Sequence, residues 1–200
     1  VLRAKCKPVD EVTSETRELA QNMIETMVDA QGVGLAAPQI GVPIQLAVID
    51  VSHDPDCISY LRVNGEDIEM KDIMPLIFTN PKLELINPKV SEQEGCLSFP
   101  DIRAMIKRPI EVKATVTTLE GGTLVIETDG LFSRAIQHET DHLHGKLFID
   151  RMPAAAKVSL KGKIRRMRET YGNGSRGLKR AICDSRSRAK RRVVGAMKAT

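Results

Sequence analysis

The sequence predicts an α+β fold, in which irregular antiparallel sheets pack around a central helix and a basic helix or tail ends the chain. Three observations lead to this class. Several segments between residues 44 and 128 have strand character, and two of them form a hairpin pattern. Apolar residues with helical spacing occur on both sides of these strands. Positive charge is concentrated from residue 157 onward. Strands and helices grouped in this way are typical of the α+β class.

The first helix is predicted within residues 11–32, EVTSETRELAQNMIETMVDAQG. Thr13 or Ser14 is the expected N-cap and Gly32 the expected stop. The apolar stripe consists of Leu19, Ala20, Met23, Ile24 and Met27. Residues 32–43, GVGLAAPQIGVP, are rich in glycine, proline and small side chains, so we expect a tight turn there rather than a regular element.

The next segments alternate between buried and exposed character. A buried strand is predicted at residues 44–51, IQLAVIDV. Residues 52–74 contain many acids and an Asn64-Gly65 pair, which indicates an exposed loop or a hairpin insertion. Strand character resumes over residues 75–88, and Pro81 is expected to interrupt it because proline cannot donate to a strand ladder.

A second hairpin follows. From Ile110 to Thr117 apolar and polar side chains alternate, which predicts a half-buried strand. The Gly121-Gly122 pair and a returning strand complete the hairpin.

The remaining pattern is helical. A second strong helix is predicted from about Leu131 to Gly145, and a basic helix over residues 154–169. The segment GNGSRG ends that helix. We therefore expect one domain over residues 1–170 and a basic tail, either disordered or engaged with a partner, over 171–200.

Composition restricts the class of protein. With 200 residues, 42% of them hydrophobic, the chain can bury one core. It has no run of about 18 uncharged apolar residues and no basic-then-apolar leader, so we expect no membrane partner and no secretory signal. The four cysteines (Cys6, Cys57, Cys96 and Cys183) are far apart and form no CxxC pair, which favours free thiols in a reducing compartment.

Charge is unevenly distributed along the chain, whose net charge is +4. From Lys157 to the end, 15 bases face two acids, a net charge of +13, whereas residues 1–156 hold 15 bases and 24 acids, a net charge of −9. A basic block of this kind favours a phosphate-rich partner such as nucleic acid or a ribonucleoprotein. A solvated, disordered tail is the alternative.

The second helix carries a His-Glu-x-x-His pattern. His138 and His142 are four residues apart, so both imidazoles can reach one metal ion, with Glu139 beside them to handle a proton. The alternative is two surface histidines on a polar helix face. Because catalytic zinc-type sites use three protein ligands, a third ligand is required.

The position of the third ligand distinguishes classes of metallohydrolase. Phe148 stands where the metzincin pattern needs a third histidine, and no glutamate lies about 20 residues after His142. An upstream ligand is therefore needed, and Cys96 in the turn-like segment EQEGCLSFP is a candidate, because a metal can deprotonate its thiol. A small buried hydrophobe is the alternative reading of a lone cysteine.

Three segments together resemble the three motifs of the peptide deformylase family. They are GVGLAAPQIG at 32–41, EGCLSFP at 94–100 and QHETDHLHG at 137–145, and the similarity extends to about Arg168. The resemblance implies a hydrolase that removes the N-formyl group from the initiator formyl-methionine of nascent polypeptides and releases formate. It implies one divalent metal per chain, held by Cys96, His138 and His142. Fe²⁺ is the metal expected in the cell, and Zn²⁺, Ni²⁺ or Co²⁺ are also possible.

Amide hydrolysis needs a proton carrier and a site for the developing oxyanion. Glu139 is placed to take the proton of the attacking water and deliver it to the leaving amine. By resemblance, Gln39 and the backbone N–H of Leu97 stabilise the oxyanion, and the backbone near Gly34 hydrogen-bonds the substrate peptide. The alternative for Glu139 is an acid on the helix surface, and the alternative for Gln39 is a surface glutamine. The alternative for the segment around Gly34 is an ordinary turn.

An apolar slot for the methionine side chain is also required. Val33, Leu131 and Ala135 are the candidates, and a purely structural core role is the alternative. Glu94 and Arg103 lie near Cys96 and are predicted to form a carboxylate-guanidinium pair that holds its loop.

The expected partners are nascent formyl-methionine polypeptides and the ribosome near the exit tunnel, without a membrane. Bacterial members dock on the ribosome through a basic C-terminal helix, which KGKIRRMRE resembles. The expected compartment is a bacterial cytoplasm, with an organelle matrix or stroma as the alternative.

The acidic 52–74 stretch and the 171–200 tail depart from the simplest members of the family. Two other functions stay open at this point. One is a metallo-amidase or peptidase with another acyl substrate, and the other is a ribonucleoprotein-binding module with a structural metal.

Overall fold

The computed structural model describes residues 1–54, 57 and 59–171. Residues up to Lys157 form one compact unit, and the described residues from Val158 onward belong to a second. The elements in chain order are α1 (Ser14–Asp29), β1 (Gly34–Ala36), the 3₁₀ turn η1 (Ala37–Ile40), β2 (Leu46–Ile49), β3 (Leu61–Val63), β4 (Glu66–Asp67), the 3₁₀ turn η2 (Met70–Asp72), β5 (Leu76–Gly95), β6 (Arg103–Thr117), β7 (Thr123–Thr128), α2 (Gly130–Leu143), α3 (Phe148–Arg151) and α4 (Ala154–Tyr171).

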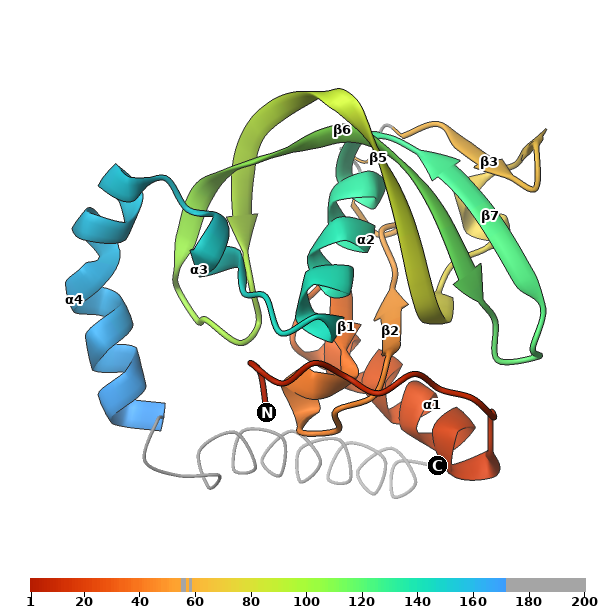
Figure 1. The fold of residues 1–200 in the computed structure, drawn as a ribbon, viewed down its shortest axis with the longest axis horizontal. Helices are drawn as coiled ribbons and strands as arrows, with labels where there is room; N and C mark the ends of the chain where they lie inside the picture. Colours follow the sequence, from red (N-terminus) through yellow and green to blue (C-terminus); the bar gives the residue numbers. More distant parts are fainter. Residues whose placement is uncertain (55–56, 58, 172–200) are drawn as a thin grey trace, which may run out of the picture. The chain divides into compact units, whose positions relative to one another are not determined.

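The strands form one antiparallel sheet. Its order is β1-β2-β5-β6-β7-β3-β4, and β5 and β6 make the longest hairpin. Figure 1 shows the sheet curving around α2, which packs against β1, β2 and β6. The predicted α+β class with a central helix is confirmed.

The core lies between the sheet and α2. Eleven of the 14 residues of α2 are buried. Phe132 and Ile136 share a hydrophobic cluster with Ile49 of β2, Phe78 of β5 and Val112 of β6. Because α2 is enclosed on most sides, the polar side chains on it are buried too, and each needs a partner.

Helix α1 agrees with the sequence prediction. Thr13 is its N-cap, and the Thr13 hydroxyl accepts a hydrogen bond from the backbone N–H of Thr16. Ala20, Met23 and Met27 face a second hydrophobic cluster. The helix ends at Asp29, three residues before the predicted glycine stop.

The prediction of an irregular turn at residues 32–43 was wrong in part. Residues 34–36 form β1, which pairs with β2 in the register Gly34↔Ile49, and residues 37–40 form η1. Tertiary pairing with β2 overrides the weak strand propensity of the small residues. Residues 52–74 were predicted as an exposed loop or a hairpin insertion, and within them β3 and β4 form a hairpin: Asn64 has φ 52 and Gly65 φ 89 in the turn between the two strands.

Strands β5 and β6 are longer than their patterns indicated. The ladder between them continues to Gly95↔Arg103, with register shifts between Thr79 and Lys82 and between Ile86 and Lys89. The predicted interruption at Pro81 is thus a local irregularity inside a continuing strand, because the ladder resumes once the proline is passed.

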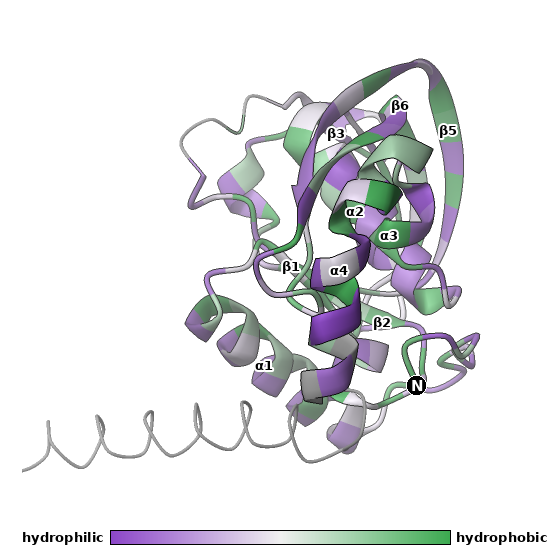
Figure 2. Ribbon diagram, turned by 90° about the vertical axis from the view of Figure 1, so that its left-hand side faces the viewer, coloured by the Kyte–Doolittle hydropathy of each residue, from purple (hydrophilic) through white to green (hydrophobic). Residues whose placement is uncertain are grey.

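The C-terminal prediction is tested only in part. Residues 154–171 form the basic helix α4, whose Lys161, Lys163, Arg165 and Arg166 are exposed. In Figure 2 the ribbon of α4 alternates between hydrophilic and hydrophobic residues. The predicted break at GNGSRG and the tail 172–200 lie outside the described residues. Within the described part of the chain, no helix combines the length and the apolar character needed to cross a membrane.

Candidate metal centre

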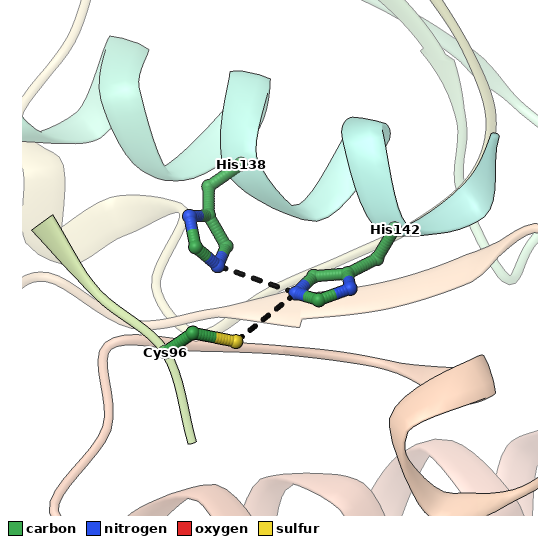
Figure 3. Close-up of side chains that lie close together, drawn as sticks. All are labelled: Cys96, His138 and His142. Carbon is green, nitrogen blue, oxygen red and sulfur yellow. Dashed lines mark hydrogen bonds between the residues drawn. The ribbon is translucent and has the colours of Figure 1, made fainter. Parts of the chain in front are cut away.

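Three predicted ligands converge between α2 and the end of β5. Cys96 is the first residue after β5 and begins a turn, in which its carbonyl accepts a hydrogen bond from Phe99 N–H at 2.8 Å. The Nε2 atom of His142 lies 3.3 Å from Cys96 Sγ and 3.3 Å from His138 Nε2 (Figure 3). The structure thus brings together three side chains from two distant segments.

This donor set fits a divalent metal. The ligand atoms all lie within 4.8 Å of one another, and two ligands of a tetrahedral ion with bonds of usual length are about 3.4 Å apart. Within residues 1–54, 57 and 59–171, no fourth His, Cys, Asp or Glu belongs to this group. Three protein ligands with one position left for water or substrate are the pattern of a catalytic site.

The two imidazoles differ electrostatically when no metal is bound. Burial lowers the pKa of His138, but its contacts with Cys96 and Glu94 outweigh burial and raise the pKa to about 10. Burial and the charge of His138 lower the pKa of His142 to about 3. One imidazolium and one neutral ring therefore occupy the site, and the imidazolium must lose its proton before it can bind a metal.

Glu94 orients the first imidazole. Its Oε2 lies 3.3 Å from Nδ1 of His138, which leaves Nε2 of that ring toward the other ligands. Burial by itself raises the pKa of Glu94, but contacts with His138 and Arg108 outweigh it and lower the pKa to about 2. Glu94 is therefore an anion at neutral pH.

The predicted pairing of Glu94 with Arg103 was wrong. Glu94 binds Arg108 at 2.6 and 3.0 Å and Arg134 at 2.7 Å, whereas Arg103 is exposed. The register explains the difference, because Ala104, Ile106 and Arg108 occupy the buried face of β6 and Arg103 the opposite face.

Arg108 continues the network toward the second imidazole. The Arg108 side chain is fully buried and also donates to Asp141 Oδ2 at 2.8 Å. Asp141 is adjacent in sequence to His142 and receives two further hydrogen bonds of 2.5 Å from Arg151 of α3. These arginines and Asp141 were missed by the sequence analysis. One sequence feature could have indicated that Arg108 is buried: it follows Ala104 and Ile106 at alternate positions, which lie on the same face of a strand.

Glu139 follows His138 on α2, is buried, and interacts electrostatically with that ligand. Its side chain lies against Gly34 of β1, where an added Cβ would stand 2.5 Å from Oε1. The Oε2 atom of Glu139 is buried without a hydrogen-bond partner, and burial raises the pKa of this carboxyl to about 7. The alternative of a helix-surface acid is therefore wrong.

Gln39 connects the first motif to the second. It is 4% exposed, its Oε1 accepts from Ala36 N–H at 2.8 Å, and its Nε2 donates to Ser98 Oγ at 3.1 Å and lies 3.7 Å from Cys96 Sγ. The alternative of an exposed loop glutamine is wrong. Leu97 packs over Gly32, where a Cβ would lie 2.8 Å from its Cδ1.

The motif order, the ligand set and the buried glutamate agree with one known family. A sequence profile described as Polypeptide deformylase matches residues 1–158. The chain belongs to the polypeptide deformylase family. Members of the family remove the formyl group from nascent peptides in a metal-dependent reaction, so this chain is a metal-dependent amide hydrolase by family.

Relatives in the deformylase family cover most of the chain. The peptide deformylase of Methylacidiphilum infernorum is 42% identical over 168 residues, which are 84% of this chain and 88% of that protein. The crystal structure of a peptide deformylase from Synechococcus elongatus in complex with actinonin matches with a TM-score of 0.67 at 35% identity, over 81% of this chain and 82% of that one. Arabidopsis thaliana peptide deformylase 1B matches with a TM-score of 0.69 at 33% identity, over 87% and 91%.

The predicted pocket residues of the deformylase site lie in one apolar cluster. Ala135 is 6% exposed, and Val33 and Leu131 are partly buried against the same core. The carbonyl of Val33 accepts a hydrogen bond from Asp50 N–H at 2.9 Å. Their role in holding a methionine side chain stays a prediction.

Proposed function

We propose that this chain removes the N-formyl group from the initiator formyl-methionine of nascent polypeptides, with Cys96, His138 and His142 as the ligands of one divalent metal. The single observation that carries the proposal is the convergence of these three side chains, with the buried carboxyl of Glu139 close enough to His138 to interact with its charge. When bound, a divalent metal lowers the pKa of a coordinated water and polarises a carbonyl oxygen.

Glu139 is proposed as the proton carrier. A carboxyl whose pKa is about 7 can accept the proton of the attacking water and return it to the leaving amine at neutral pH. The contact with Gly34 limits the positions open to its side chain. This arrangement supports a general base and acid rather than a ligand, because Glu139 is not part of the group formed by the three ligand side chains.

Gln39 and Leu97 are proposed to stabilise the oxyanion. The Oε1 atom of Gln39 is held by Ala36 N–H, which fixes the orientation of the amide and leaves its NH₂ group toward Cys96 and Ser98. A preorganised donor of this kind contributes more to the transition state than a mobile one. The backbone N–H of Leu97 is the second donor, by resemblance to the family.

Substrate recognition is proposed to combine an apolar slot with backbone hydrogen bonds. Val33, Leu131 and Ala135 line the slot for the methionine side chain, and the backbone of β1 at Gly34 pairs with the peptide as an added strand. The position of β1 at one end of the sheet order supports this role.

Fe²⁺ is proposed as the metal in the cell, with Zn²⁺, Ni²⁺ or Co²⁺ as possible substitutes, because one thiolate and two imidazoles accept several divalent ions. Residues 1–170 are proposed as the catalytic domain. The exposed bases of α4, together with the tail 171–200, are proposed to bind the ribosome near the exit tunnel. The proposed compartment is a bacterial cytoplasm, with an organelle matrix or stroma as the alternative.

The test is release of formate by protein purified without oxygen, with its bound metal quantified. A formyl-methionine peptide is compared with the matching acetyl-methionine peptide. We expect turnover of the formyl peptide alone, its loss with a chelator, and recovery with one equivalent of metal. Faster turnover of the acetyl peptide would instead identify a different acyl substrate. Deletion of residues 171–200 tests the tail: turnover of the small peptide should persist while ribosome binding weakens at moderate salt.

A further inference from the structure

The short helix α3 lies directly beside the proposed metal centre. Its Phe148 ring centroid is 6.3 Å from that of His138 and 5.4 Å from that of Phe99, in the turn that follows Cys96. The same helix carries Arg151, whose guanidinium binds Asp141 through both carboxylate oxygens. Helix α3 therefore contacts the site by packing and by charge.

A continuous chain of charged contacts joins Arg151 to a metal ligand. Arg151 binds Asp141, Asp141 shares its Oδ2 with Arg108, Arg108 binds both oxygens of Glu94, and Glu94 contacts His138 Nδ1 at 3.3 Å. The carboxylates are at most 9% exposed and Arg108 is fully buried, so solvent does not compensate a lost contact.

Arg151 and Arg108 share the carboxylate of Asp141. With Arg151 present, Asp141 receives three hydrogen bonds and needs only one from Arg108. Without it, the Oδ1 atom of Asp141 loses its donor, and the carboxylate competes with Glu94 for the same buried guanidinium. Loosening of Glu94 then releases the ring orientation of His138.

We propose that Arg151 is a positioning residue for the metal centre, acting through Asp141, Arg108 and Glu94 on His138. It touches no ligand side chain and its own side chain is 34% exposed, so its effect is indirect. The inference rests on the proposed metal site and adds to it a residue outside the three family motifs.

The chain offers a matched control on the same helix. Arg3 forms a bidentate pair with Asp150, the residue before Arg151, and one contact of this pair is 2.9 Å long. Both partners are substantially exposed, at 54% and 41%, and within the described residues neither side chain hydrogen-bonds Asp141, Arg108 or Glu94. Arg3→Met therefore removes a comparable pair from α3 and leaves the buried chain of contacts intact.

The experiment measures Co²⁺ binding to metal-free wild-type, Arg151→Met, Arg151→Lys and Arg3→Met proteins, by chelator competition and by absorption spectra. We expect Arg151→Met to bind Co²⁺ about tenfold more weakly, with altered ligand-field bands, and Arg3→Met to stay within about twofold of wild type. Arg151→Lys should be intermediate, because lysine keeps the charge but lacks the planar fork. In the Co²⁺-loaded enzyme, kcat should fall more than KM changes.

Equal Co²⁺ affinity and spectra for Arg151→Met and Arg3→Met would overturn the inference. If Arg151→Met does not fold, as judged by circular dichroism, Arg151→Lys decides: weaker Co²⁺ binding supports the inference and wild-type behaviour overturns it. If the wild-type protein does not bind Co²⁺ with a thiolate charge-transfer band, the proposed metal site fails and the inference fails with it. If the wild-type protein binds Co²⁺ in this way and Arg151→Met behaves like Arg3→Met, only the inference fails.

Discussion

Gly34 and Glu139 approach so closely that a Cβ on Gly34 would lie 2.5 Å from Glu139 Oε1. Gly34 is in β1 and does not have a positive φ, so its backbone conformation does not require glycine. The requirement is the space that the carboxylate occupies. The first motif thus keeps a residue without a side chain at the point where the third motif places its acid.

Gly34→Ala should therefore move Glu139. We expect kcat/KM for a formyl-methionine peptide to fall at least about tenfold, because small displacements of a proton carrier are costly. The free energy of unfolding should fall by about 1–3 kcal/mol through overpacking. Gly122→Ala is the control, because its Cβ would meet only Thr118 Oγ1 at an ordinary 3.5 Å. Equal kinetics for the two variants would contradict the steric account.

Arg108→Met should destabilise the fold strongly. The substitution leaves the carboxylates of Glu94 and Asp141 buried with a main partner removed, which costs about 3–5 kcal/mol of the free energy of unfolding. Arg62→Met is the control, since the pair of Arg62 and Asp67 is exposed and its loss should change the free energy of unfolding little. Urea unfolding of both variants measures the difference, and similar losses would show that the buried network is not structurally important.

Acid should lower the free energy of unfolding of the metal-free protein, because Glu94 becomes protonated. Its pKa falls from 4.5 in the unfolded chain to about 2 in the folded protein, so its contribution is complete above pH 4.5 and is lost as the pH falls toward 2. A shift of this size corresponds to about 3 kcal/mol. The free energies of unfolding of wild type and Glu94→Gln are measured between pH 6 and 2. The difference between the two free energies should become smaller over the lower part of that range. A gap independent of pH would contradict the assignment.

Metal binding should release protons at pH 7. In the metal-free protein the pKa of His138 is about 10, so this ring is protonated and must lose a proton to become a ligand. Calorimetric titration with Zn²⁺ in two buffers of different ionisation enthalpy counts the protons, and at least one per bound metal is expected. Binding with identical heat in both buffers would contradict the predicted charge of His138.

The sequence predicted those features that depend on local patterns. The amphipathic face of α1, the hairpin at Asn64-Gly65 and the spacing of His138 and His142 on α2 are fixed by residues close in the chain. Cys96 could be proposed as the third ligand because the histidine pair was incomplete without one.

The parts that were missed depend on pairing over long distances. Strand β1 forms because β2 offers a partner, and the small residues of the segment give little sign of it. Arg108 is charged and precedes a proline, so its local sequence favours an exposed turn. The register of β5 with β6 places Arg108 on the buried face, where it binds Glu94. Arg103 is closer to Glu94 in the sequence, and for this reason the sequence alone suggested the wrong partner.

Glu139 is central to this account, and one comparison tests it most directly. Formate release and bound metal are measured for wild type, Glu139→Ala and the exposed-acid control Glu66→Ala, all purified without oxygen. We predict that Glu139→Ala retains one metal per chain and loses activity at least about 100-fold, while Glu66→Ala matches wild type. Activity that persists in Glu139→Ala, or that disappears only together with the metal, would contradict the role of Glu139 as the proton carrier.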